Sequence, residues 1–79
     1  MDANEAIKLM VASTGKSMRT ISGELGMRHT YVKDLTRKPS VPRADTLARI
    51  ADACGFDLVL VPRNGDVSFM VVDPPEATS

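Results

Sequence analysis

Two short segments with helical spacing meet at Gly26, and this junction constrains the fold more than any other feature of the sequence. Upstream of it, Ile21 and Leu25 are four residues apart, which places them on one face of a helix. Downstream, a second helix is expected to begin near Arg28. Two helices joined by a few residues can cross steeply only where the contact residue is small and the turn accepts a left-handed residue. Ser22 and Gly26 meet these two requirements.

Two further helices are expected, one on each side of this pair. The first starts at Asp2, which can cap it, and ends at Gly15; Ser17 is then a suitable cap for the second. The proline-containing segment 38–42 stops the third helix, and a fourth runs over about 43–54. The central pair of helices directs apolar residues inward, with Met27 filling the space between them: Ile21, Leu25, Val32 and Leu35.

The spacing of apolar residues changes from helical to strand-like after the mainly α domain predicted for residues 1–55. Runs at 56–61 and 67–72 flank Asn64 and Gly65, which suit a two-residue type I′ turn because both of its positions need positive φ. A β-hairpin follows, with four opposed pairs: Arg63 and Asp66, Leu60 and Phe69, Val59 and Met70, Leu58 and Val71.

This register leaves apolar side chains on both faces of the hairpin, residues 56–72, and an exposed patch of this kind usually marks an interaction surface. We therefore expect a second copy of the chain to cover it, through a dimer interface that comprises Leu58, Val59, Leu60, Val61, Phe69, Met70 and Val71. The alternative is that the first helix covers the second face within the same chain. Residues 73–79 are expected to form a disordered tail.

Charge is distributed unevenly along the chain, although the formal net charge is zero. Eight basic and three acidic residues lie between positions 15 and 50, which gives this segment a charge of +5, and the flanking segments are acidic. Such asymmetry within a small domain indicates an anion-binding face.

The sequence does not support an enzyme, a metalloprotein or a membrane protein. It has no carboxylate pair with a supporting base, no nucleophile beside a histidine and no phosphate-binding loop, so no catalytic residue and no cofactor is predicted. Cys54 and His29 are the single cysteine and histidine, so no metal site is expected, and Cys54 is interpreted as a core residue. No apolar run approaches the roughly 20 residues that span a bilayer, which favours a cytoplasmic protein.

Four features follow one another along the chain: Ser22 and Gly26, the inward apolar residues, the basic loop with Pro42, and the segment 45–51 that leads to Gly55. In this order they resemble the Cro and phage-repressor (Xre-like) helix-turn-helix family. The resemblance implies a four-helix, lambda-repressor-like fold that binds double-stranded DNA with its third helix in the major groove.

The resemblance also implies which residues touch DNA. Base contacts are expected from matching positions on the outward side of the third helix: His29, Thr30, Lys33 and Asp34. Arg28, at the start of this helix, can grip a base or a phosphate. By their chemistry, Lys33 can donate to guanine and Asp34 can accept from cytosine. Asp34 can instead pair with Arg37 or Lys38. Phosphate contacts are expected from residues around this helix: Ser17, Arg19, Tyr31, Arg37, Lys38 and Arg43. Tyr31 can alternatively be a core residue.

Two residues depart from the family pattern. Met18 stands where the family often has a phosphate-contacting glutamine, and Arg28 stands where a serine or threonine often caps the recognition helix. Losing that cap costs about 1 kcal/mol unless another group replaces it.

We therefore expect a DNA-binding transcriptional regulator, most simply a repressor, that acts as a homodimer on palindromic half-sites about one helical turn apart. An alternative comes from the segment from Gly55 to Pro62, which resembles the terminal strand of HipB-type antitoxins. Such a protein would dimerise through the strand, bind a toxin partner and repress its own operon. A protein-interaction module is a further alternative, because a fold does not prove DNA binding.

Overall fold

Local capping signals decide where the first two helices begin and end. The Asp2 side chain accepts a hydrogen bond from the Glu5 amide at 2.9 Å, and Gly15 ends the helix with a φ of 73°. The Ser17 hydroxyl accepts from the Thr20 amide at 3.1 Å and starts the next helix. These three caps were predicted from the sequence and are confirmed.

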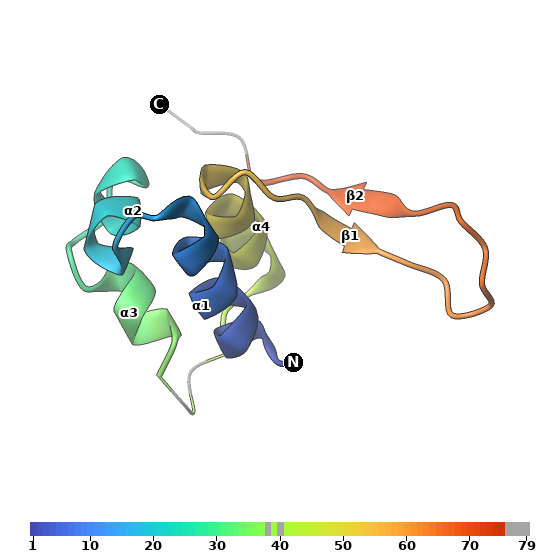
Figure 1. Ribbon diagram of the computed structural model, residues 1–79, viewed down its shortest axis with the longest axis horizontal. Helices are drawn as coiled ribbons and strands as arrows, with labels where there is room; N and C mark the ends of the chain where they lie inside the picture. Colours follow the sequence, from blue (N-terminus) through green and yellow to red (C-terminus); the bar gives the residue numbers. More distant parts are fainter. Residues whose placement is uncertain (38, 40, 76–79) are drawn as a thin grey trace.

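The computed structural model describes residues 1–37, 39 and 41–75 of the chain. Within these residues the protein is mainly helical, with four helices followed by a two-stranded antiparallel sheet (Figure 1). The elements are α1 (Ala3–Thr14), α2 (Met18–Glu24), α3 (Tyr31–Leu35), α4 (Ala44–Ala53), β1 (Leu58–Leu60) and β2 (Met70–Val72). The predicted disordered tail falls partly on residues 76–79, which lie outside the described residues.

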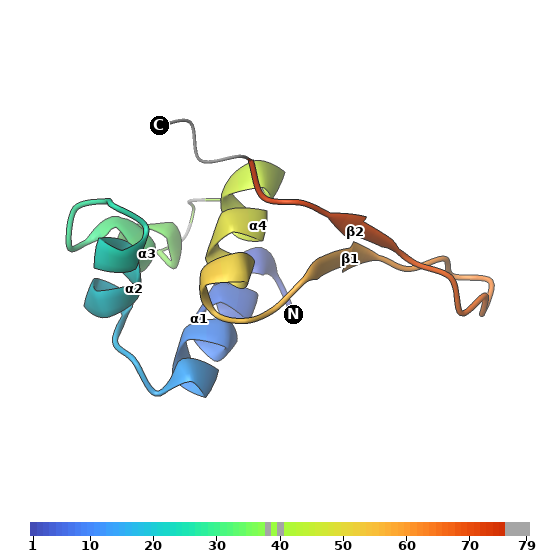
Figure 2. The ribbon, with the colours of Figure 1, turned by 90° about the horizontal axis from the view of Figure 1, so that it is seen from above.

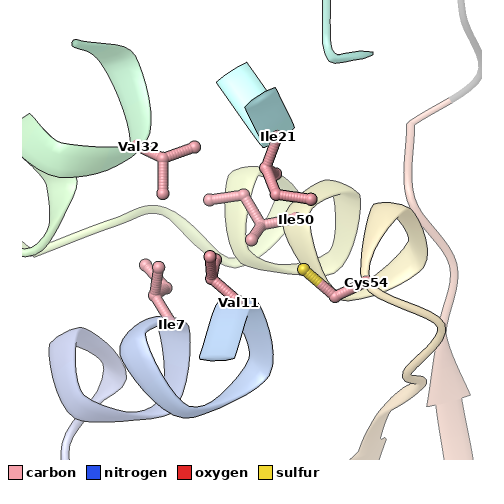
Figure 3. Close-up of a cluster of buried hydrophobic side chains, with 6 residues drawn as sticks. All are labelled: Ile7, Val11, Ile21, Val32, Ile50 and Cys54. Carbon is pink, nitrogen blue, oxygen red and sulfur yellow. The ribbon is translucent and has the colours of Figure 1, made fainter. Parts of the chain in front are cut away.

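The core lies where all four helices meet. Figure 3 shows apolar side chains from each helix converging there, namely Ile7, Val11, Ile21, Val32, Ile50 and Cys54. Leu25 and Leu35 pack against this cluster in half-buried positions. Cys54 is buried, as the sequence predicted, and burial together with nearby Glu24 raises the pKa of its thiol. Met27 is 38% exposed, so the prediction that it fills the space between the helices is wrong.

The third helix starts later than the sequence predicted. It begins at Tyr31 rather than near Arg28, because its first bond of α-helical spacing runs from the Asp34 amide to the Thr30 carbonyl at 2.8 Å. Before it, the Tyr31 amide donates to the Arg28 carbonyl at 3.0 Å, which closes a tighter turn. Arg28 and His29 therefore lie in the connection between α2 and α3, and Thr30 is the N-cap residue.

The hairpin forms in a register that differs by one residue from the predicted one. Its pairs are Leu58 with Val72, Val59 with Val71, and Leu60 with Met70. Within the described residues, positive φ in this loop occurs at Gly65 alone (84°), so Asn64 does not adopt the conformation that a type I′ turn needs. The Asn64 side chain instead accepts from the Asp66 amide at 3.0 Å.

The register decides which residues share a face of the hairpin. Leu58, Leu60, Met70 and Val72 now lie on one face, and Val59 and Val71 lie on the other. The predicted register placed Leu60 opposite Phe69 and Arg63 opposite Asp66, and both of these pairings are therefore wrong. The strands are also shorter than the predicted runs of 56–61 and 67–72.

The hairpin extends away from the helices, on the side opposite to α2 and α3, as both ribbon views show (Figures 1 and 2). The radius of gyration of 13.1 Å exceeds the roughly 12 Å of a compact domain of this length. Only the base of the hairpin is half-buried, at Leu58 and Val72. The alternative in which the first helix covers the second face of the hairpin within the same chain is therefore not observed. None of the helices in the described part of the chain is long and apolar enough to cross a membrane.

Candidate nucleic-acid interface

The N-terminus of α3 is capped by a side chain from α2. Ser22 is fully buried, and its hydroxyl accepts a hydrogen bond from the Val32 amide at 3.0 Å while it donates to the Met18 carbonyl at 2.8 Å. Val32 is the second residue of α3, and its amide is one of the donors that a helix start leaves without an internal partner. No side-chain hydrogen bond from Thr30 caps the helix. Ser22 therefore replaces the local cap that the sequence lacks at this point.

The C-terminus of α3 is held by a side chain from α1. Asn4 is 5% exposed, and its Nδ2 atom donates a hydrogen bond of 2.6 Å to the carbonyl of Leu35, the last residue of α3. Sequence reasoning missed this residue. A usable signal was present, because Asn4 precedes Ile7 and Val11 at helical spacing and so lies on the buried face of α1. A polar group on such a face must find a hydrogen-bond partner.

The predicted base-contacting residues lie on α3 or just before it. Arg28, His29, Thr30 and Lys33 are exposed, and Asp34 is half-buried. The structure brings two of them together, since Arg28 Nη2 lies 3.6 Å from Asp34 Oδ2. The partner of Asp34 is therefore Arg28 and not Arg37, which had been predicted; the other predicted partner, Lys38, lies outside the described residues.

The predicted phosphate-contacting residues are spread over three helices and their ends. Ser17 starts α2, with its hydroxyl 3.0 Å from that of Thr20, and Arg19 is exposed on the same helix. Arg37 is exposed after α3, whereas Tyr31 is half-buried and packs against the core, as its alternative interpretation expected. Arg43 precedes α4 and donates to Asp45 at 3.1 Å. Lys38 completes the predicted set, outside the described residues.

Each acidic residue of the basic segment 15–50 is paired with a basic one. Glu24 lies 2.7 Å from Lys16, while Asp34 and Asp45 lie beside arginines at 3.6 and 3.1 Å. The side chains involved are 39–83% exposed, and exposed pairs of this kind stabilise a fold by only about 0–1 kcal/mol. The acidic groups are thus neutralised locally, and the segment keeps its excess of five positive charges.

The described residues contain no group of three His, Cys, Asp or Glu side chains placed to hold a metal ion. Comparisons with protein-family models, curated proteins and solved structures gave no match to this chain. Its function is therefore inferred from its own residues and their geometry.

Proposed function

We propose that this protein is a sequence-specific DNA-binding transcriptional regulator with a lambda-repressor-like helix-turn-helix fold, in which α2 and α3 form the motif. One observation carries the proposal. α3 has only five residues, yet buried Ser22 and Asn4 fix its two ends while basic and polar groups surround it on the outside. An isolated helix of this length is unstable in water, so its position depends on these contacts. A helix fixed in this way, with Lys33 exposed on it and basic and polar residues exposed just before it, is suited to the major groove.

In this proposal the residues at the start of α3 read bases. Residues near the N-terminus of a recognition helix contact base edges, and this is where Arg28, His29 and Thr30 lie, with Lys33 one turn further along. The Arg28 guanidinium lies 3.6 Å from the Asp34 carboxylate, and this pairing offsets the repulsion of Asp34 from DNA. An arginine can donate two hydrogen bonds to guanine.

Arginines around this helix position the protein on the DNA backbone. Arg19, Arg37 and Arg43 belong to the basic segment, and they are exposed. Phosphate contacts carry no sequence information, but they supply affinity that falls with added salt.

The experiment starts with selection of bound DNA from a random pool, followed by affinity measurements on the full chain. Lys33→Ala is expected to weaken binding roughly 10- to 100-fold and to relax the preference at one base pair. Arg37→Ala is expected to weaken binding to all sequences and to reduce the salt slope by about 0.9. Lys8→Ala on α1 removes the same charge outside the basic segment and serves as the matched control. If both variants bind as tightly as Lys8→Ala, the proposed function is wrong.

A regulator of this kind acts as a homodimer, because two copies recognise a two-fold symmetric site. The selected DNA is therefore expected to be palindromic. A consensus without two-fold symmetry would contradict the dimeric part of the proposal.

A further inference from the structure

The hairpin exposes an unusual amount of apolar surface for a small protein. Large apolar side chains at 59–61 and 67–71 are between 37% and 93% exposed, with Val67 and Met70 among the highest. Leu60 and Met70 lie on one face of the hairpin and Val59 and Val71 on the other, so both faces are apolar and exposed. Exposed apolar surface of this kind usually marks an interaction site.

An apolar groove of about 340 Å³ lies at the base of the same hairpin. α1 contributes Leu9 and Met10 to its lining, α4 contributes Leu47 and Ala51, and Phe56 and Leu58 close it where the chain enters β1. Leu9 is 56% exposed and Phe56 is 45% exposed, so the groove opens to the outside. Its lining contains one charged residue, Asp57.

We propose that a second copy of this chain fills the groove, with the two hairpins packed in opposite directions so that the tip of each lies in the groove of its partner. This rests on the proposed function only in that a regulator of palindromic sites needs two copies. From Leu58 to Gly65 an extended chain spans roughly 20 Å, so the hairpin is a long arm. When two such arms run antiparallel, each tip reaches the base of the other arm, and the groove lies at that base.

Two further observations favour a second copy over a different protein. A two-fold interface must be self-complementary, and this chain carries both a protruding apolar element and an apolar groove beside it. Charge is complementary as well. Arg63, near the tip, is the single basic residue after position 50, and it would meet the partner's Asp57 in the groove. Val67, 93% exposed near the tip, is the apolar side chain that enters the groove against Leu9.

The first test is the oligomeric state of full-length variants, measured by sedimentation equilibrium. Leu9→Asp in the groove and Val67→Asp near the hairpin tip should each weaken the dimer by more than about 100-fold, because each buries an unpaired charge in an apolar contact. Val41→Asp places the same charge at a residue that is 79% exposed and belongs to neither surface, and it should leave the dimer intact. Circular dichroism checks that each variant is folded.

The second test uses disulfide cross-linking and does not depend on disruptive variants. A Leu9→Cys protein mixed with a Val67→Cys protein should form a covalent dimer on oxidation, whereas each protein alone should form little. The native Cys54 is buried and does not interfere. A Val67→Cys protein that cross-links efficiently to itself would show that the two hairpin tips meet each other, and it would overturn the proposal.

The interface proposal would also be overturned if the native protein were monomeric at about 100 μM, or if Leu9→Asp left the dimer unaffected. Loss of the dimer to the same extent in the groove variant and in the hairpin variant would support it. DNA binding distinguishes the two proposals. The Leu9→Asp monomer should still bind a single half-site as the isolated native subunit does, with the same dependence on Lys33. If half-site binding persists while the groove experiments fail, the interface proposal falls and the proposed function stands.

Discussion

α3 and the hairpin are both too short to be stable alone, yet they are held in different ways. A five-residue helix does not form by itself in water, and neither does an isolated two-stranded hairpin. α3 places Val32 in the core and has both ends bonded by buried side chains of other helices. The hairpin contacts the helices through its base, and its loop is organised by local bonds of Asn64 and Asp66.

The two regions therefore reach a defined conformation in different ways. The position of α3 is fixed by tertiary contacts, so it should be lost only when the helical core is lost. The hairpin depends on local turn chemistry and on whatever covers its apolar faces. Because the two regions lie at opposite ends of a molecule 40 Å long (Figure 1), the effects of substitutions in them should be additive.

The largest expected effect comes from the helical core. Ile50→Ala removes a fully buried side chain that packs in the cluster containing Val32, and it should lower the free energy of unfolding by about 3 kcal/mol. Val67→Ala, at a hairpin residue that is 93% exposed, should change it by less than about 0.5 kcal/mol in the monomer. Urea denaturation of dilute protein measures both. Equal losses would mean that the hairpin unfolds as part of the core.

The next effect tests how α3 is held. Ser22→Ala leaves the Val32 amide without its acceptor in a buried position, which should cost about 2 kcal/mol of stability. Ser13→Ala is the matched control, because the Ser13 hydroxyl also donates to a backbone carbonyl, that of Met10 at 2.7 Å, but is exposed. Hydrogen exchange of the Val32 amide should accelerate in Ser22→Ala and not in the control. Unchanged exchange would show that Ser22 does not cap α3.

The sequence predicted what depends on neighbours along the chain. Asp2, Gly15 and Ser17 cap or end helices through bonds that each span three residues, and all three were identified. The buried residues followed from helical spacing for the same reason. Exposure of His29, Thr30 and Lys33 in the candidate site also followed, because Val32 and Leu35 point inward.

What the sequence did not reveal depends on the tertiary arrangement. Asn4 and Leu35 are 31 residues apart, and Ser22 and Val32 are ten apart. Nothing in the sequence around either residue of a pair identifies its hydrogen-bond partner. The start of α3 was misplaced because the cap lies on another helix. The contact between Arg28 and Asp34 joins a turn to a helix and does not follow the three- or four-residue spacing of helical pairs.

Replacing a glycine by alanine should change the stability of the protein in opposite directions in the helical domain and in the hairpin. Gly23 lies in α2, and an added Cβ would have no neighbour within 4 Å, so Gly23→Ala should stabilise the protein by about 0.5–1 kcal/mol. Gly65 has a φ of 84°, which costs an alanine about 1–2 kcal/mol. Gly65→Ala should therefore shift the amide resonances of β1 and β2 and leave those of α3 unchanged. If Gly23→Ala lowered the free energy of unfolding, the expected contrast between the helical domain and the hairpin would be wrong.

The smallest effect is a pH dependence confined to the hairpin loop. The Asp66 carboxylate accepts hydrogen bonds from Ser68, including one from its amide at 2.9 Å, and these lower the pKa of Asp66 below its ordinary value of 3.8. Because the folded pKa is the lower one, the loop contact is fully formed above the ordinary pKa and is lost as the pH falls through the folded pKa. The Ser68 amide resonance should accordingly titrate with a midpoint below 3.8, while the Val32 amide should stay constant over the same range. Asp66→Asn removes the titration of Ser68 and serves as the control. If the Val32 amide resonance titrated with the same midpoint, α3 would respond to the protonation of Asp66. The hairpin loop and α3 would then not be independent of each other.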